Sequence, residues 1–182
     1  MSHKFIQPLG IGFALLCFFT AGFLLHQGGL PERAEFTGIM IDAEHFAPEV
    51  NQQAPPLFLS RFRENRAITL TEYEGQFLIL NFWATWCIPC RVESQVFNEL
   101  LAKYPEVAIV AVNTGDSDQD VSRWVEELRP AYTIGLDPPG AVTSLYAVRG
   151  LPTTFVISPE GIIIEILYGP VILPQLEQFI RT

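Results

Sequence analysis

Cysteine and histidine are scarce in this chain, and their scarcity limits the metal sites that the sequence could build. The 182 residues contain three cysteines and three histidines. His3, His26 and His45 all fall near the N-terminus, whereas Cys87 and Cys90 lie far downstream. A structural zinc site needs four cysteine or histidine ligands, usually in two spaced pairs. We therefore expect no metal site.

Basic residues are also few. The chain carries 11 lysines and arginines against 20 aspartates and glutamates, which gives a formal net charge of −9. A protein that binds nucleic acid needs clustered basic side chains to displace the counterions of the phosphates. We therefore expect no nucleic-acid partner. The hydrophobic content of 49% and the charged content of 17% are instead typical of a chain that buries a core.

The N-terminal segment lacks charge altogether between Ile6 and Leu25. About 20 apolar residues match the hydrocarbon thickness of a bilayer, so residues 1–25 are predicted to be a membrane anchor. A cleaved export signal is the alternative. Lys4 precedes the apolar run, and the preference of basic residues for the cytoplasmic side predicts an exported C-terminal domain. The expected protein is a single-pass protein of the cell membrane, held in the lipid bilayer by residues 6–25, with its C-terminal domain on the extracytoplasmic, periplasmic side.

The rest of the chain divides into a tether and a folded unit. Residues 26–54 are mixed in character and predict a tether, and residues 55–182 predict one domain. The patterns in that domain predict strands at residues 57–60, 67–70, 76–83, 107–114, 132–137, 153–158 and 161–167, and helices at residues 90–103, 118–129, 140–148 and 173–181. Such alternation, with a hairpin at the end, predicts an α/β fold in which helices flank a central mixed sheet.

The helix expected at residues 90–103 carries an apolar stripe at Val92, Val96 and Leu100, spaced by four residues. Residues at this spacing share one face of a helix. The stripe therefore supports a helix in this segment.

The stretch "NFWATWCIPC" places Cys87 and Cys90 two residues apart, where the expected strand meets the expected helix. A structural disulfide at this spacing would close a very short loop and would constrain the unfolded chain little. A redox dithiol is favoured, because the free N–H groups and the dipole at a helix start stabilise a thiolate at Cys87. Cys87 would attack a partner disulfide, and Cys90 would then release the partner by attacking Cys87.

The stretches "LNFWATWCIPCRVE" and "VRGLPTTFVISPEGIIIE" resemble the membrane-anchored, extracytoplasmic thiol-disulfide reductases of the TlpA/ResA type, which belong to the thioredoxin superfamily. The resemblance runs from about Pro55 to the C-terminus. It implies a thioredoxin-like fold with a redox-active disulfide, in which Cys87 is the nucleophile and Cys90 the resolving cysteine. It also implies that Pro152 is a cis-proline that faces this disulfide and helps to dock substrate.

The resemblance implies roles for four further residues. Glu93 falls where the relatives carry a glutamate one helical turn beyond the second cysteine. If it is partly buried, its pKa would be raised and it could take a proton from the resolving thiol; a solvated helix glutamate is the alternative. Trp86 is expected to be an exposed platform for the partner protein, and Leu151 and Thr153 are expected to dock substrate beside it.

Three positions bear on how far the resemblance reaches. Asn81 stands where thioredoxins carry a buried aspartate beneath the cysteines. The stretch "ESQVF", which starts at Glu93, lacks the proline that relatives often carry soon after this glutamate. Ile88, between the cysteines, is bulky and uncharged, and residues at this place tune the redox potential.

The resemblance implies an enzyme, a protein disulfide reductase that works outside the cytoplasmic membrane without a cofactor. Its expected partners are client protein disulfides, such as those of apocytochrome c, and a membrane dithiol that donates electrons. The alternatives are an oxidase or isomerase that forms disulfides, and a non-catalytic membrane-tethered module that binds clients at Trp86 and Pro152. A peroxidase is disfavoured because Ala84, and not Thr or Ser, lies three residues before Cys87. We expect a monomer.

Overall fold

A computed structural model of the chain describes residues 47–181. The described residues belong to one compact unit, Glu44–Thr182. The predicted anchor and most of the predicted tether lie outside the described residues. Among residues 47–181, no helix has the length and apolar character needed to cross a bilayer.

Strands and helices alternate along the described residues. The strands are β1 (Phe58–Arg61), β2 (Ala67–Thr69), β3 (Leu78–Trp83), β4 (Ala108–Asn113), β5 (Thr133–Leu136), β6 (Thr153–Ile157) and β7 (Ile163–Tyr168). The helices are α2 (Ile88–Lys103), α3 (Asp118–Leu128), α4 (Ala141–Leu145), α5 (Leu173–Ile180) and the short 3-10 helix η1 (Leu70–Tyr73). Every expected strand and helix is present, whereas η1 was not expected.

The strands form one mixed sheet in the order β2-β1-β5-β4-β3-β6-β7. Strands β3, β4 and β5 run parallel to one another, and β6 pairs antiparallel with β3. The expected α/β architecture with a central mixed sheet is therefore confirmed. Because parallel neighbours end at the same edge of a sheet, the loops after β3 and β4 meet there.

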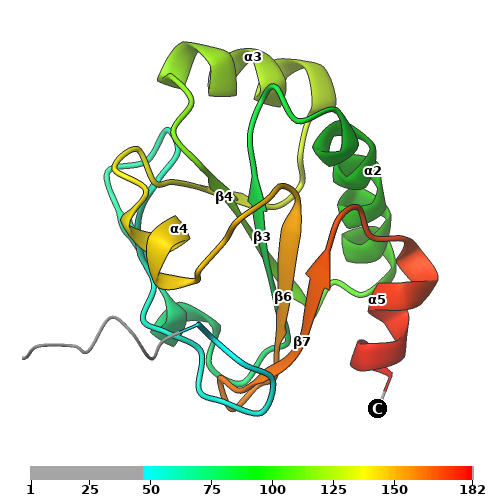
Figure 1. The fold of residues 1–182 in the computed structure, drawn as a ribbon. Helices are drawn as coiled ribbons and strands as arrows, with labels where there is room; N and C mark the ends of the chain where they lie inside the picture. The colour runs from blue at the N-terminus through cyan, green and yellow to red at the C-terminus, as the bar shows by residue number, and fades with distance from the viewer. Residues whose placement is uncertain (1–46, 182) are drawn as a thin grey trace, which may run out of the picture. The chain divides into compact units, whose positions relative to one another are not determined.

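Helices cover both faces of this sheet (Figure 1). Helices α2 and α5 pack on the face that presents Ile79, and α4 packs on the opposite face, which presents Leu80 and Phe82. Strand β3 is buried on both faces along its whole length. This explains its continuous apolar run, in which Asn81 is the one polar side chain.

The helix that the apolar stripe indicates is present, but the stripe coincides only in part with the buried face of α2. Leu100 is buried, but Val92 is exposed and Val96 is only partly buried. The buried face of α2 consists of Cys90, Glu93, Ser94, Phe97 and Leu100. The two valines therefore lie away from the centre of the contact, and a glutamate faces the sheet.

The end of the predicted tether is bonded to the folded unit. The backbone N–H of Asn51 donates to the carbonyl of Ile163 over 2.8 Å, and that of Ala54 donates to Gly161 over 2.9 Å. Residues 51–54 therefore lie against the turn between β6 and β7, at the end of the sheet where β3 begins.

Candidate active site

Cys87 and Cys90 form a disulfide where β3 gives way to α2. Cys87 is the N-cap of α2 with an extended backbone, and Pro89 occupies the first turn, where no N–H is needed. The backbone N–H of Cys90 donates to the sulfur of Cys87 over 3.3 Å. Both cysteines are buried. A helix N-terminus therefore faces the first sulfur, as the sequence predicts.

The neighbouring loop after β4 holds the turn that leads into the cysteines. The carboxylate of Asp116 accepts the backbone N–H of Thr85 over 2.6 Å and the side-chain amide of Asn113 over 2.7 Å. Asn113 in turn accepts the backbone N–H of Asp116 over 3.0 Å. Neither residue was predicted from the sequence. Asn113 ends β4, which is parallel to β3 and adjacent to it, and Asp116 lies in the loop that follows.

The loop before β6 lies at the same edge of the sheet. Thr153, the first residue of β6, pairs with Phe82 near the end of β3. The Leu151–Pro152 peptide bond is cis, as the resemblance implied. Leu151 packs against the cluster that contains both cysteines. The side chain of Thr153 is buried and donates to the carbonyl of Gly150 over 2.8 Å, so it holds the loop from within.

Exposed apolar side chains lie on both sides of this edge. Trp86 is 71% exposed and Ile88 is 75% exposed, and Val92 follows one turn later on α2. Tyr168 pairs with Thr153 at the end of β7, and Ile172 is the N-cap of α5. We call these five residues the apolar rim: Trp86, Ile88, Val92, Tyr168 and Ile172. Trp86 therefore has the exposure expected of a platform, and its docking role stays a prediction.

Glu93 lies one helical turn beyond Cys90 and is fully buried, with 0% exposure. Its Oε1 accepts the backbone N–H of Val171 over 3.1 Å, and its Oε2 accepts the side-chain amide of Asn81 over 2.7 Å. Burial raises the pKa of this carboxyl to about 7, although both hydrogen bonds lower it. The interpretation as a solvated helix glutamate is therefore wrong, because the side chain is inside the protein.

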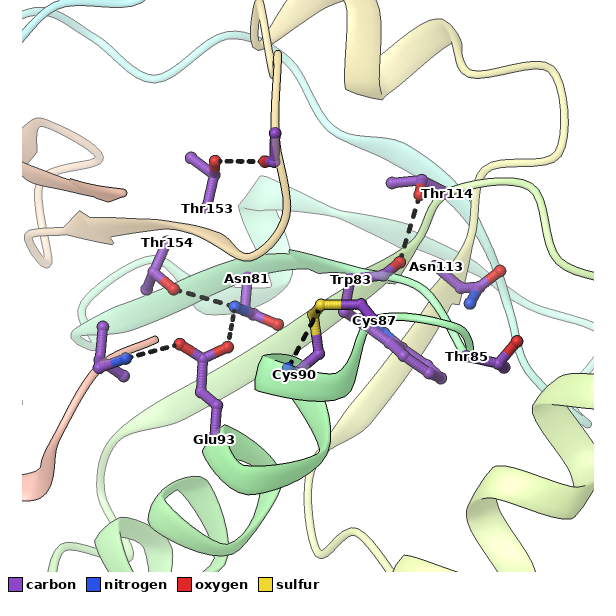
Figure 2. The surroundings of a disulfide bond; sticks show 12 residues. Asn81, Trp83, Thr85, Cys87, Cys90, Glu93, Asn113, Thr114, Thr153 and Thr154 are labelled. Carbon is purple, nitrogen blue, oxygen red and sulfur yellow. Dashed lines mark hydrogen bonds between the residues drawn. A yellow bond between two sulfur atoms is a disulfide. The ribbon is translucent and has the colours of Figure 1, made fainter. Parts of the chain in front are cut away.

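Asn81 connects this carboxyl to the strand that follows the cis-proline. Its amide nitrogen donates to Glu93 and also to the hydroxyl of Thr154 in β6, over 2.9 Å. Figure 2 shows the side chains of Asn81 and Glu93 pointing toward one another, with Cys90 on the preceding turn of the helix. Elements far apart in the sequence thus meet at one ionisable group: β3, α2, β6 and the segment before α5.

Two tryptophans pack in the cluster that contains both cysteines. The rings of Trp83 and Trp124 pack at a centroid distance of 4.3 Å, and both side chains are buried. The guanidinium of Arg91, which is paired with Glu127, lies 5.2 Å from the centroid of the Trp124 ring. Trp124 therefore packs in the cluster that contains both cysteines. Among residues 47–181, no three histidine, cysteine, aspartate or glutamate side chains are close enough to hold a metal ion.

Comparisons with known proteins agree with this geometry. Residues 50–166 match the model of the AhpC/TSA family. The chain is 30% identical over 162 residues to the thiol-disulfide oxidoreductase ResA of Bacillus thuringiensis subsp. konkukian, covering 88% of this chain and 86% of the relative. It is 36% identical over 141 residues to ResA of Geobacillus thermodenitrificans, covering 76% of this chain and 80% of the relative.

A solved structure is similar as well. A Chlorobium tepidum protein, assigned as a thiol:disulfide interchange protein DsbE, superimposes with a TM-score of 0.68 at 30% identity. The match covers 74% of this chain and 96% of that one. The expected thioredoxin-like fold is therefore confirmed for the described domain, and the surroundings of the disulfide are those of a redox enzyme and not of a structural cross-link.

Proposed function

The chain belongs to the AhpC/TSA family and is a thiol-disulfide oxidoreductase of the ResA type, and we propose that it reduces protein disulfides outside the cytoplasmic membrane. One observation carries the proposal: the Cys87–Cys90 disulfide lies at the start of a helix whose next turn carries Glu93, with its carboxyl buried. The first sulfur can attack a partner there, and the second has a proton acceptor nearby.

In the proposed reaction, the reduced cysteine pair gives two electrons to a client disulfide. The thiolate of Cys87 attacks one client sulfur, so the client S–S bond breaks and a mixed disulfide forms. The thiol of Cys90 gives its proton to Glu93, and its sulfur attacks Cys87. The Cys87–Cys90 bond then forms again, the mixed disulfide breaks, and the client sulfur that Cys87 had attacked leaves. The client becomes a dithiol by taking protons from Glu93 and solvent, and the enzyme ends as the disulfide.

The buried carboxyl favours the reducing direction. A carboxylate one turn away disfavours a second negative charge on sulfur, which makes the reduced form less stable relative to the disulfide. A pair whose reduced form is less stable has a more negative reduction potential and donates electrons more readily. The resulting enzyme disulfide would be reduced again by a membrane dithiol, because an oxidising compartment has no ready supply of thiols.

The opposite direction is the second candidate, and the position of Cys87 favours it. A thiolate at a helix N-terminus is stabilised, and strong oxidants owe their potential to a stable reduced form. An oxidase or isomerase would result if this effect exceeded that of Glu93.

The apolar rim supports a polypeptide client. Trp86 and Ile88 expose large apolar surfaces beside the first sulfur, and an aromatic anchor of this kind contributes strongly to protein recognition. The net charge of −9 disfavours an acidic client. Client cysteines such as those of apocytochrome c are the class that the resemblance implies. The uncharged segment at residues 6–25 supports a membrane anchor that would keep the domain near both its client and its electron donor.

The reduction potential tests the direction of electron flow. We would equilibrate the protein in dithiol buffers and measure the thiols of Cys87 and Cys90 by alkylation. A value near that of thioredoxin, about −270 mV, would support the reductase. A value near that of a strong periplasmic oxidant, about −120 mV, would contradict it and favour disulfide formation.

A further inference from the structure

Asn81 is a polar residue in the centre of an apolar strand, and its donors are fully committed. The other residues of β3 are apolar, and Asn81 is only 2% exposed. Its amide nitrogen has two hydrogens, one for the carboxylate of Glu93 and one for the hydroxyl of Thr154. Burying an amide costs free energy unless it forms hydrogen bonds, and these two bonds offset that cost for Asn81.

We propose that Asn81 is a positioning residue, which fixes the carboxyl of Glu93 between β3 and the backbone N–H of Val171 and so sets its readiness to accept a proton. The inference rests on the proposed role of Glu93 in proton transfer. Asn81 itself exchanges no proton and touches no substrate. The side-chain N–H of Asn81 can donate a hydrogen bond to Glu93 whether the carboxyl is charged or neutral, so Asn81 can hold it in both states.

The geometry gives the carboxyl one orientation. Each oxygen of Glu93 accepts one N–H group, from opposite sides: Asn81 on the sheet and Val171 in the segment before α5. Thr154 anchors Asn81 from β6, so the amide cannot turn away without losing its second bond. Hydrogen bonds to the charged form of an acid stabilise that form. Losing Asn81 would therefore leave the carboxyl with one donor fewer and a stronger hold on its proton.

Because the side chain at position 81 is an amide and does not ionise, Glu93 has no second carboxyl beside it there and is expected to titrate in a single step. An aspartate there would place a second carboxyl at the 2.7 Å contact that the amide now makes with Glu93. Two carboxyl groups this close share a single proton and titrate in two separated steps. Tyr132 also interacts with Glu93, and burial raises its pKa to about 12, so it remains neutral throughout. In the reduced enzyme, the thiols of Cys87 and Cys90 join these groups.

The titration of Glu93 can be measured directly. The full-length protein in its disulfide form would be labelled with ¹³C at glutamate side-chain carboxyls, and the Glu93 resonance would be identified by its loss in Glu93→Gln. For Asn81→Ala we expect the midpoint to move up by roughly 1 to 2 pH units, which is the effect of losing one hydrogen bond to a charged group. For Asn81→Asp we expect two separated steps in place of one.

Two further variants separate positioning from general loosening. Thr154→Val removes the anchor of Asn81 while keeping the shape of the side chain, and should move the midpoint up by a smaller amount. Asn113→Ala removes an equally buried asparagine from the neighbouring strand, and should leave the midpoint unchanged. The inference would be overturned by an unmoved midpoint in Asn81→Ala, or by an equal shift in Asn113→Ala. If Asn81→Ala does not fold, a single step in Asn81→Asp together with an unmoved midpoint in Thr154→Val overturns it.

The proposed role of Glu93 is judged by a separate measurement. The pH profile of disulfide reduction should move with the carboxyl midpoint in each Asn81 variant. If the carboxyl titrations shift as expected while the rate profiles do not, then Asn81 positions Glu93 but Glu93 accepts no proton in the reaction. That outcome refutes the proposed role and leaves the positioning intact.

Discussion

Replacing Glu93 by glutamine should change the stability of the protein in a way that depends on pH. The carboxyl is fully buried, and its pKa in the folded state is about 7 against 4.5 for an exposed glutamate. The folded protein therefore binds this proton more tightly than the unfolded chain does. The contribution of Glu93 to the free energy of unfolding is therefore largest at low pH. It declines as the pH rises from 4.5 to about 7 and is constant above that range.

The size of the effect follows from the pKa difference. One pKa unit corresponds to about 1.4 kcal/mol, so wild type should lose about 3 kcal/mol across this range through Glu93 alone. Glu93→Gln cannot ionise and should not lose it. Glutamine also has a fixed cost, since its NH₂ group must meet the N–H donor of either Asn81 or Val171. That cost is the same at every pH, and it cancels when the difference between variant and wild type is compared at two pH values.

The assay is chemical or thermal unfolding of the disulfide form near pH 4.5 and near pH 8.5. Relative to wild type, Glu93→Gln should gain about 3 kcal/mol between the two conditions, or roughly 6 to 12 °C in Tm. The matched control is Glu99→Gln, an exposed glutamate on the same helix, whose effect should be small at both pH values. If the difference between Glu93→Gln and wild type is the same at both pH values, burial does not raise the pKa of Glu93 and the reasoning fails.

Two further predictions concern exchange with clients. Cys87→Ser should abolish turnover. Cys90→Ser should accumulate a mixed disulfide through Cys87, which mass spectrometry can identify. If a double Cys87/Cys90 serine variant still works in the cell, that result would favour the non-catalytic client-binding module. Trp86→Ala should raise KM for a protein client by a factor of about 30, the loss of a typical aromatic anchor, without changing the reduction of a small disulfide. Phe58→Ala, an equally exposed aromatic residue on β1, is its control, and an equal loss there would show that the effect is not local to the apolar rim.

The elements of the fold could be predicted because each has a strong local pattern. The run from Leu78 to Trp83 is apolar throughout because β3 is buried on both faces. The order of the strands in the sheet could not be read in the same way. The β1–β2 hairpin pairs with β5, about 70 residues further along the chain, and that pairing depends on packing between distant segments. Local patterns do not contain this information.

The cysteines could be predicted from their own motif, but the groups that support them could not. Asp116 contributes a side chain from a loop with no motif of its own, and Val171 contributes only its backbone N–H. Every residue except proline has such a group, so its use at a site leaves no trace in the sequence.

Glu93 is different, because its burial could have been inferred. The expected stripe was counted from Val92, but counting back from Phe97 and Leu100 by four and seven residues places Glu93 on the same face. Large apolar side chains indicate the buried face of a helix better than valines, which also occur at its margins. A glutamate on that face requires donors, since a buried carboxylate without them is very costly. The adjacent strand β3 offers a single polar side chain, Asn81. The hydrogen bond between Asn81 and Glu93 could therefore have been predicted from the sequence.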